Sequence, residues 1–236
     1  MSCPRSSSSE PCPPCRSGRQ PIFLVIANVL VWLVGFTTGW TEPMQIEGGF
    51  WAARLHDTLY GHSSALPPDY PWIVPVWLTP VTSAFLHAGL FHLAMNMLVL
   101  VVIGRIVELA LGWERYLLLY GAGIIAAAAV HYAIDPVSMV PVVGASGAIS
   151  ALMAAYFLLF SRRKPPAIGP VPQIVVHMAW LMAAWIGINL LSQLAFAGTA
   201  LGIAIWAHIG GFAAGLLLAV PLVRSHQVRR PRHDIP

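Results

Sequence analysis

Long uncharged stretches dominate the chain, and short segments that carry the charges separate them. A helix needs about 20 apolar residues to cross the hydrocarbon layer of a membrane, because each residue adds about 1.5 Å. Prolines at positions 71, 75 and 80 interrupt one stretch, so its helix is expected to begin near Thr82. The pattern predicts six membrane spans: 22–40, about 82–104, 116–134, one within 136–161, and two within 165–223 joined near Gly198.

The basic residues indicate how these spans are oriented. Six spans place both termini on one side of the membrane, and basic residues collect on the cytoplasmic side. With cytoplasmic tails and cytoplasmic loops after the second and fourth spans, only Arg54 lies outside. The sequence therefore predicts an all-α polytopic membrane protein with both termini in the cytoplasm. The basic residues then inside are Arg5, Arg16, Arg19, Arg105, Arg115, Arg162, Arg163, Lys164, Arg224, Arg229, Arg230 and Arg232.

The segments outside the spans define the domain organisation. Residues 1–20 contain four consecutive serines and several prolines with little to bury, which predicts a disordered cytoplasmic tail. Residues 21–223 form the membrane domain, and residues 224–236 form a basic cytoplasmic tail. The outer loop, 41–81, mixes Trp51, Trp72 and Trp77 with charged residues, as an interfacial lid or brace would.

Composition supports a membrane location and excludes other classes. Only 9% of residues are charged, against about 25% in soluble domains, and the mean hydropathy is +0.71. The pI near 9.3 does not indicate a nucleic-acid partner, because the charges lie at the ends of apolar runs. Cys12 and Cys15, with Cys3, have half the spacing of a zinc site but no second ligand pair. We therefore expect no metal or other cofactor.

A few polar residues lie inside the predicted spans, where hydrocarbon offers them no water. They are His87, His92 and Asn96 in the second span, Ser146 in the fourth and His208 in the sixth. Counting back to the cytoplasmic charges places His92, Ser146 and His208 about 20 to 24 Å above the inner boundary. Three spans thus present reactive groups at one depth, and His92 and Asn96 share a helix face.

Small residues indicate which spans touch. Gly211 and Gly215 lie on the helix face that carries His208. Ser146 is followed by Gly147, Ser150, Ala151 and Ala154. Small residues at this spacing allow helix backbones to approach closely in lipid, so the fourth and sixth spans are expected to bring Ser146 and His208 together.

This arrangement favours hydrolysis by a serine nucleophile. A neutral His208 would take the proton of Ser146, and His92, Asn96 and the Ser146 N–H would stabilise the resulting oxyanion. The nearest acids, Glu108 and Asp135, lie at span boundaries, so we expect a Ser-His dyad and not a triad. The sequence has no HExxH zinc motif and no pair of aspartates within spans, so neither zinc-dependent nor aspartyl intramembrane proteolysis is expected.

Three motifs, in this order, resemble those of the rhomboid intramembrane serine proteases, and the resemblance covers about 21–223. They are His92-x-x-x-Asn96 preceded by His87, Gly144-Ala145-Ser146-Gly147, and Ala207-His208-x-x-Gly211-x-x-x-Gly215. The resemblance implies a six-helix rhomboid-like bundle with Ser146 as nucleophile and His208 as general base. It also implies an oxyanion hole of His92, Asn96 and the Ser146 N–H, helped by the Ala145 N–H.

The resemblance further implies a multi-pass protein of the bacterial cell membrane that cuts transmembrane segments of other proteins near their extracytoplasmic end. The fifth span and the loop at 194–200 would gate the site. Structural roles are expected for Gly104, Glu108, Gly112 and Tyr120. The sequence departs from the family where Ser150 replaces a frequent aromatic residue that packs on the histidine. It also departs where Trp51 and Arg54 replace an adjacent Trp-Arg pair.

Two alternatives belong to other classes of protein. The first is a noncatalytic membrane protein that binds and escorts transmembrane clients, using the same polar residues. The second is a redox carrier with histidine ligands to haem or a metal, although His131 and His177 do not match the other histidines in depth.

Overall fold

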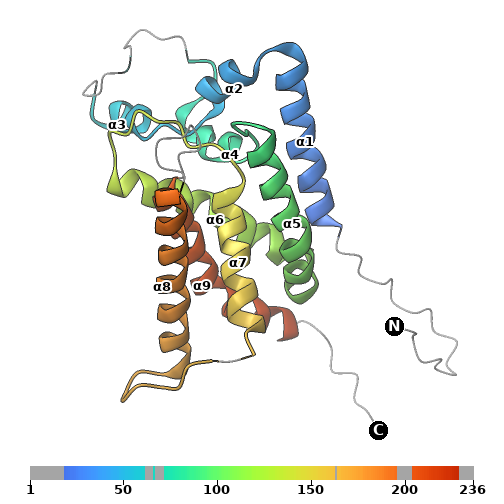
Figure 1. The fold of residues 1–236 in the computed structure, drawn as a ribbon, viewed down its shortest axis with the longest axis vertical. Coiled ribbons are helices and arrows are strands. Elements are labelled where there is room, and N and C mark those ends of the chain that lie inside the picture. Colours follow the sequence, from blue (N-terminus) through green and yellow to red (C-terminus); the bar gives the residue numbers. More distant parts are fainter. Residues whose placement is uncertain (1–18, 62–65, 67–71, 163, 196–203, 229–236) are drawn as a thin grey trace, which may run out of the picture.

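The computed structural model describes residues 19–61, 66, 72–162, 164–195 and 204–228. Apart from two isolated β-bridges, every regular element in these residues is helical, which confirms the predicted all-α class (Figure 1). The elements are α1 Gln20–Thr38, α2 Thr41–Gly48, α3 Ala52–Tyr60, the 3-10 helix η1 Val76–Leu78, α4 Thr79–Ser83, α5 Leu90–Leu111, α6 Trp113–Ile134, α7 Ser146–Phe160, α8 Gln173–Ala195 and α9 Ile205–Val228.

Five helices of the described part are long and apolar enough to cross a membrane: α1, α5, α6, α8 and α9. The fourth expected span corresponds to α7, which has only 15 residues. Nine of them are buried, and α7 packs against α5, α6, α8 and α9 (Figure 1). A helix enclosed by others needs little length in contact with lipid. Six spans remain a prediction, because length and composition identify five.

The start of the second span was predicted wrongly. The structure ends α4 at Ser83 and begins α5 at Leu90, with a loop between them. The Ser83 carbonyl accepts a hydrogen bond from the Gly144 N–H at 2.8 Å, and Gly89 is fully extended at φ −179° and ψ 172°. Neither feature fits a continuous helix. His87 therefore lies in the loop that precedes the span, and not within it.

The close packing predicted between the fourth and sixth spans is present between α7 and α9. A Cβ atom added at Gly211 would overlap the carbonyl oxygen of Gly147, and one at Gly215 would overlap that of Ala151. The two backbones are thus in direct contact, and only glycine fits at these positions. This contact holds the start of α7 against the first turns of α9.

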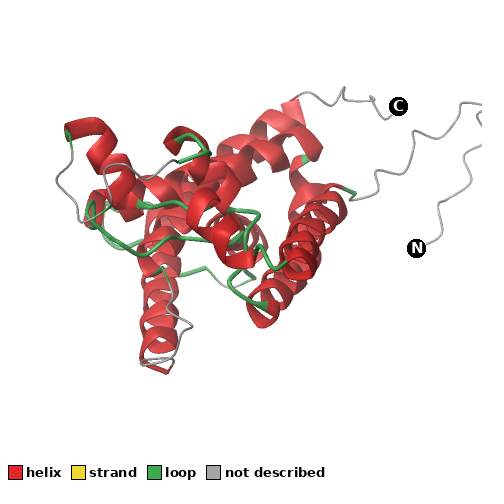
Figure 2. Ribbon diagram, turned by 90° about the horizontal axis from the view of Figure 1, so that it is seen from above, coloured by secondary structure: helices red, strands yellow, loops and turns green. Residues whose placement is uncertain are grey.

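The outer loop forms short helices at the end of the bundle where α7 begins (Figure 1). Seen from above, green loops cross this end between the red helices (Figure 2). Phe50 and Val142 exchange backbone hydrogen bonds of 3.0 and 2.9 Å, and the Ala53 N–H donates to the Ser138 carbonyl at 3.2 Å. These bonds attach the loop to the segment that leads into α7. They favour the brace interpretation of the loop over the lid.

Arg54 anchors this loop from inside. It is buried, donates to the Val74 carbonyl, and lies 4.1 Å from the centre of the Trp72 ring. Burial lowers the pKa of Arg54, and the nearby negative charge of Glu47 offsets only part of this shift. The carbonyl and the aromatic face offset part of the cost of desolvating the cation. In this chain, Arg54 thus contacts the ring of Trp72.

The start of α1 and the end of α9 both contact residues beside the α5–α6 turn. The Gln20 N–H, at the start of α1, donates to Glu108 Oε1 at 3.4 Å. Near the end of α9, Ser225 accepts hydrogen bonds from Arg115 at 3.0 and 3.2 Å. The start of α1 and the end of α9 therefore lie on one side of the described bundle. The cytoplasmic identity of that side, and the limits of the two tails, remain predictions.

Candidate active site

Ser146 and His208 lie side by side. Ser146 is the first residue of α7, and His208 lies in the first turn of α9. The distance from His208 Nε2 to Ser146 Oγ is 2.8 Å. This is within the range over which a base can take a proton from a hydroxyl group. Two residues chosen from sequence for their shared depth are thus in hydrogen-bond contact.

The other nitrogen of the histidine ring contacts a residue that the sequence reasoning missed. His208 Nδ1 lies 2.7 Å from Oδ1 of Asn189, a buried residue of α8. The signal was present in the sequence, because Asn189 is a polar residue within an apolar span. The rule that selected His92 and Asn96 would also have selected it.

Ser150 does not take the place of the missing aromatic side chain. Its Oγ donates to the Ser146 carbonyl at 2.7 Å, one helical turn back. The ring that accompanies His208 comes instead from Trp185 of α8, with ring centres 6.5 Å apart. Trp185 also stacks on Phe212 at 4.9 Å, and its Nε1 donates to the His208 carbonyl at 3.4 Å.

His92 and Asn96 lie against the backbone that leads into Ser146. Gly144 has a φ of +117°, and a Cβ atom there would be 2.8 Å from His92 Nε2 and 3.7 Å from Asn96 Nδ2. Asn96 Nδ2 donates to the His92 carbonyl at 3.1 Å. Because an amide group carries two hydrogens, the second can serve another acceptor. His87, in the preceding loop, packs edge-on against the His92 ring at 5.1 Å.

The start of α7 adds backbone donors to this group. The first N–H groups of a helix have no acceptor within the helix and carry a partial positive charge. Ser146 occupies the first position, the buried Ala145 precedes it, and no side chain in the described part caps this end. A negative charge that develops beside Ser146 would therefore face backbone N–H groups as well as Asn96 and His92.

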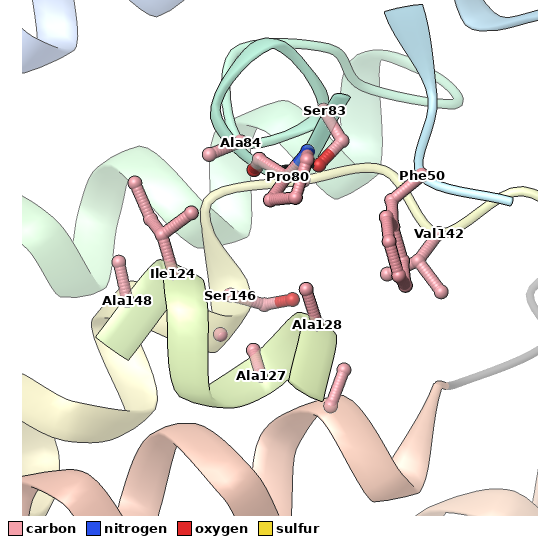
Figure 3. A pocket seen from close by; sticks show the side chains of 13 residues that line it. Phe50, Pro80, Ser83, Ala84, Ile124, Ala127, Ala128, Val142, Ser146 and Ala148 are labelled. Carbon is pink, nitrogen blue, oxygen red and sulfur yellow. Dashed lines mark hydrogen bonds between the residues drawn. The ribbon is translucent and has the colours of Figure 1, made fainter. Parts of the chain in front are cut away.

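A small cavity adjoins the serine (Figure 3). It has a volume of about 20 Å³, enough for about one water molecule. Ser146 extends toward Ala128 of α6. Phe50 and Pro80 of the outer loop line the side of the cavity that faces away from α6. The outer loop therefore covers the space beside Ser146.

Three of the residues expected to have structural roles lie in packing or capping contacts. Glu108 caps α1 as described above, and Tyr120 is buried in the core. A Cβ atom at Gly104 would be 2.9 Å from the hydroxyl oxygen of Tyr116, so the absence of a side chain allows this packing.

The remaining sequence hypotheses receive no support or fall outside the described residues. Within the described ranges, no three His, Cys, Asp or Glu side chains cluster as metal ligands would. His131 packs edge-on against Phe50, at 6.4 Å between ring centres. Cys3, Cys12 and Cys15 lie outside the described residues. So does most of the gate expected at 194–200, and its first two side chains are not described.

Comparison with known proteins identifies a family that this chain matches. The family model described as "Rhomboid domain" matches residues 75–225. The chain is 27% identical over 173 residues to "Rhomboid-related protein 3" of Homo sapiens, covering 63% of the chain and 37% of that protein. It is 25% identical over 158 residues to "Rhomboid-type serine protease 2" of Emericella nidulans, covering 66% and 29%.

Not every similar protein is named as an enzyme. "Inactive rhomboid-related protein 2" of Caenorhabditis elegans is 26% identical over 178 residues, covering 71% of the chain and 48% of that protein. The matched regions span less than half the length of each of these three relatives. The family model covers well over half of the chain. The chain belongs to the rhomboid family.

Proposed function

We propose that this chain is an intramembrane serine endopeptidase that uses Ser146 and His208 as a catalytic dyad. The observation that carries the proposal is the 2.8 Å contact between His208 Nε2 and Ser146 Oγ. A serine hydroxyl is a weak nucleophile until a neighbouring base accepts its proton. Family membership, with one similar protein named as a serine protease, supports the same chemistry.

The geometry suggests a conventional acyl-transfer sequence. Ser146 Oγ attacks the carbonyl carbon of the scissile peptide bond, while His208 Nε2 takes the hydroxyl proton. The oxyanion is stabilised by the Ser146 N–H, with Asn96, His92 and the Ala145 N–H as further donors. His208 then gives its proton to the leaving nitrogen, which breaks the peptide bond and leaves an acyl group on Ser146. Water, activated by His208, hydrolyses this ester and restores the serine.

The proposed substrates are transmembrane segments of other membrane proteins, cut near their extracytoplasmic end. Ser146 lies at the end of the bundle covered by the outer loop, and charge placement assigns that end to the outside. Segments with small and helix-weakening residues are expected to be preferred, because a peptide bond must leave its helix before a serine can reach it. We place the protein in the bacterial cell membrane, with water entering from the outer side.

The test is cleavage in a defined membrane. The purified chain is reconstituted in liposomes with a transmembrane substrate that carries helix-destabilising residues near its outer end. We expect cleavage by the native chain and none above background by Ser146→Ala or His208→Ala. Cleavage that survives Ser146→Ala would refute the mechanism.

Similarity to a protein named as inactive supports a second candidate function. In that case the chain binds and escorts transmembrane clients without cutting them. Client binding would then be unchanged in Ser146→Ala, and the native chain would cleave no helix-destabilised substrate. The same reconstitution therefore separates the two functions.

A further inference from the structure

Asn189 is a buried amide within the apolar helix α8, and only 4% of it is exposed. An amide in such surroundings is costly unless its groups are paired. Both of its polar atoms have partners. Its Nδ2 donates to the Trp185 carbonyl at 2.9 Å, and its Oδ1 lies 2.7 Å from His208 Nδ1.

These two contacts determine which nitrogen of His208 carries the proton. A backbone carbonyl can only accept a hydrogen bond, so the Trp185 carbonyl requires the NH₂ end of the Asn189 amide. The amide oxygen is then the atom that faces the imidazole ring. Since that oxygen can only accept, His208 Nδ1 must be the donor and carry the hydrogen. In the neutral ring, Nε2 is therefore left with a lone pair, and this lone pair faces Ser146 Oγ.

We propose that Asn189 is a positioning residue that holds His208 in the tautomer and orientation needed to activate Ser146. This inference rests on the proposed serine-protease function. A neutral amide does this without placing another charge in the membrane. When His208 takes the serine proton, its Nδ1–H remains directed at Asn189 Oδ1, and the hydrogen bond strengthens because the ring is then positive.

The surroundings of Asn189 fit this role. Trp185 lies one helical turn earlier in α8, beside the His208 ring, and donates to the His208 carbonyl. Two residues of α8 thus hold one residue of α9. The position that would bear an aromatic residue in α7 is occupied by Ser150, which bonds to its own helix. Orientation of the histidine therefore depends on α8 in this chain.

The test compares three single substitutions in the 236-residue chain. Asn189→Ala removes the acceptor for Nδ1–H. Asn189→Asp keeps an acceptor oxygen for Nδ1–H, and in the protonated acid the hydroxyl group replaces the NH₂ group as donor to the Trp185 carbonyl. Asn28→Ala is the matched control, because Asn28 is also a fully buried amide whose Nδ2 donates four residues back, to the Leu24 carbonyl at 2.7 Å, but it lies in α1.

Cleavage of the reconstituted substrate gives kcat and KM, and thermal unfolding gives the stability of each variant. We expect Asn189→Ala to lower kcat about 10- to 100-fold with KM within about twofold, since a base held in the wrong tautomer loses part of its contribution. Asn189→Asp is expected to stay within about fivefold of the native kcat. The control Asn28→Ala should lose stability and keep its kcat.

The inference would be overturned by an unchanged kcat in Asn189→Ala, by an equal loss of kcat in Asn189→Asp, or by a loss that appears in KM alone. A fall in kcat that only matches the fall in Asn28→Ala would show a structural role and would also overturn it. These results are distinct from failure of the proposed function, in which the native chain does not cleave or Ser146→Ala still does.

Discussion

At the scale of single residues, Gly144 has an outsized influence on the candidate site. Its φ of +117° lies in a region that residues with a side chain rarely adopt, and the His92 ring occupies the space of the missing Cβ. The residue thereby lets His92 and Asn96 approach the backbone next to Ser146. A side chain at this position would strain the backbone and displace these donors together.

Replacing Gly144 with alanine should therefore lower kcat strongly and lower the unfolding temperature only slightly. A Cβ atom would be 2.7 Å from His92 Cε1, so the ring must move, and we expect kcat to fall about 100-fold, as small misplacements of catalytic groups do. The matched control is Gly39→Ala, since Gly39 also has a positive φ, +74°, but nothing within 4 Å of its added Cβ. Cleavage rates and unfolding temperatures of both variants test this prediction. Equal rates in the two variants would contradict the prediction.

Asn96 provides a second prediction at this scale. If it only helps to hold the oxyanion, Asn96→Ala should slow turnover by up to about 100- to 1,000-fold, with less effect on KM. Steady-state cleavage of the reconstituted substrate measures both constants. A higher KM at an unchanged kcat would show that Asn96 binds substrate and does not stabilise the oxyanion.

The sequence allowed prediction of some residue contacts and not others, for physical reasons. Ser146 and His208 could be paired because helix rise converts position into depth, and their helices carry matching small residues. Asn189 was detectable as a polar residue within an apolar span, but its contact with His208 depends on how α8 packs against α9, which no local pattern reveals. His87 was misplaced because the bond from Gly144 to the Ser83 carbonyl joins segments far apart in sequence, and no local pattern reveals it.

At the scale of elements, the contact between α7 and α9 places the two candidate catalytic residues together. Gly211 and Gly215 have no room for side chains against the backbone of α7. The helix pairing was predictable, since small residues at this spacing are typical of close membrane contacts. The length of α7 was not, because charge-free stretches show where a helix can lie and not where it begins.

The helix contact predicts opposite effects for the same substitution at two positions. Gly211→Ala should destabilise the protein by about 1–3 kcal/mol, because the added methyl group meets the Gly147 carbonyl and the helices must separate. Gly187→Ala in α8, where nothing lies within 4 Å, should be neutral or slightly stabilising, because alanine favours a helix. Thermal unfolding in detergent measures both. Similar unfolding temperatures would show that α7 and α9 are not in such close contact.

At the scale of the whole molecule, the bundle carries its candidate site near one end, beneath the outer loop. The start of α1 and the end of α9 both contact the α5–α6 turn. The positive-inside rule assigns this turn to the cytoplasm, with Arg54 as the only basic residue outside. This orientation stays a prediction, and it rests on the rule that basic residues collect in short cytoplasmic loops.

The native cysteines provide a direct test of the orientation. Cys3, Cys12 and Cys15 belong to the tail expected in the cytoplasm. In intact cells, a membrane-impermeant maleimide should label them only after permeabilisation. In a chain with these cysteines changed to serine, Leu59→Cys in the outer loop should react without permeabilisation, because Leu59 is exposed. The reverse pattern would invert the assigned topology and place Ser146 near the cytoplasm.

The central claim is that Ser146 is a nucleophile activated by His208, and its most direct test is labelling with a serine-directed fluorophosphonate. The reagent forms a covalent bond only with an activated serine hydroxyl, so no natural substrate is required. We predict that the native chain is labelled, and that Ser146→Ala and His208→Ala are not. Absence of labelling in a folded native chain, or equal labelling of Ser146→Ala, would contradict the claim.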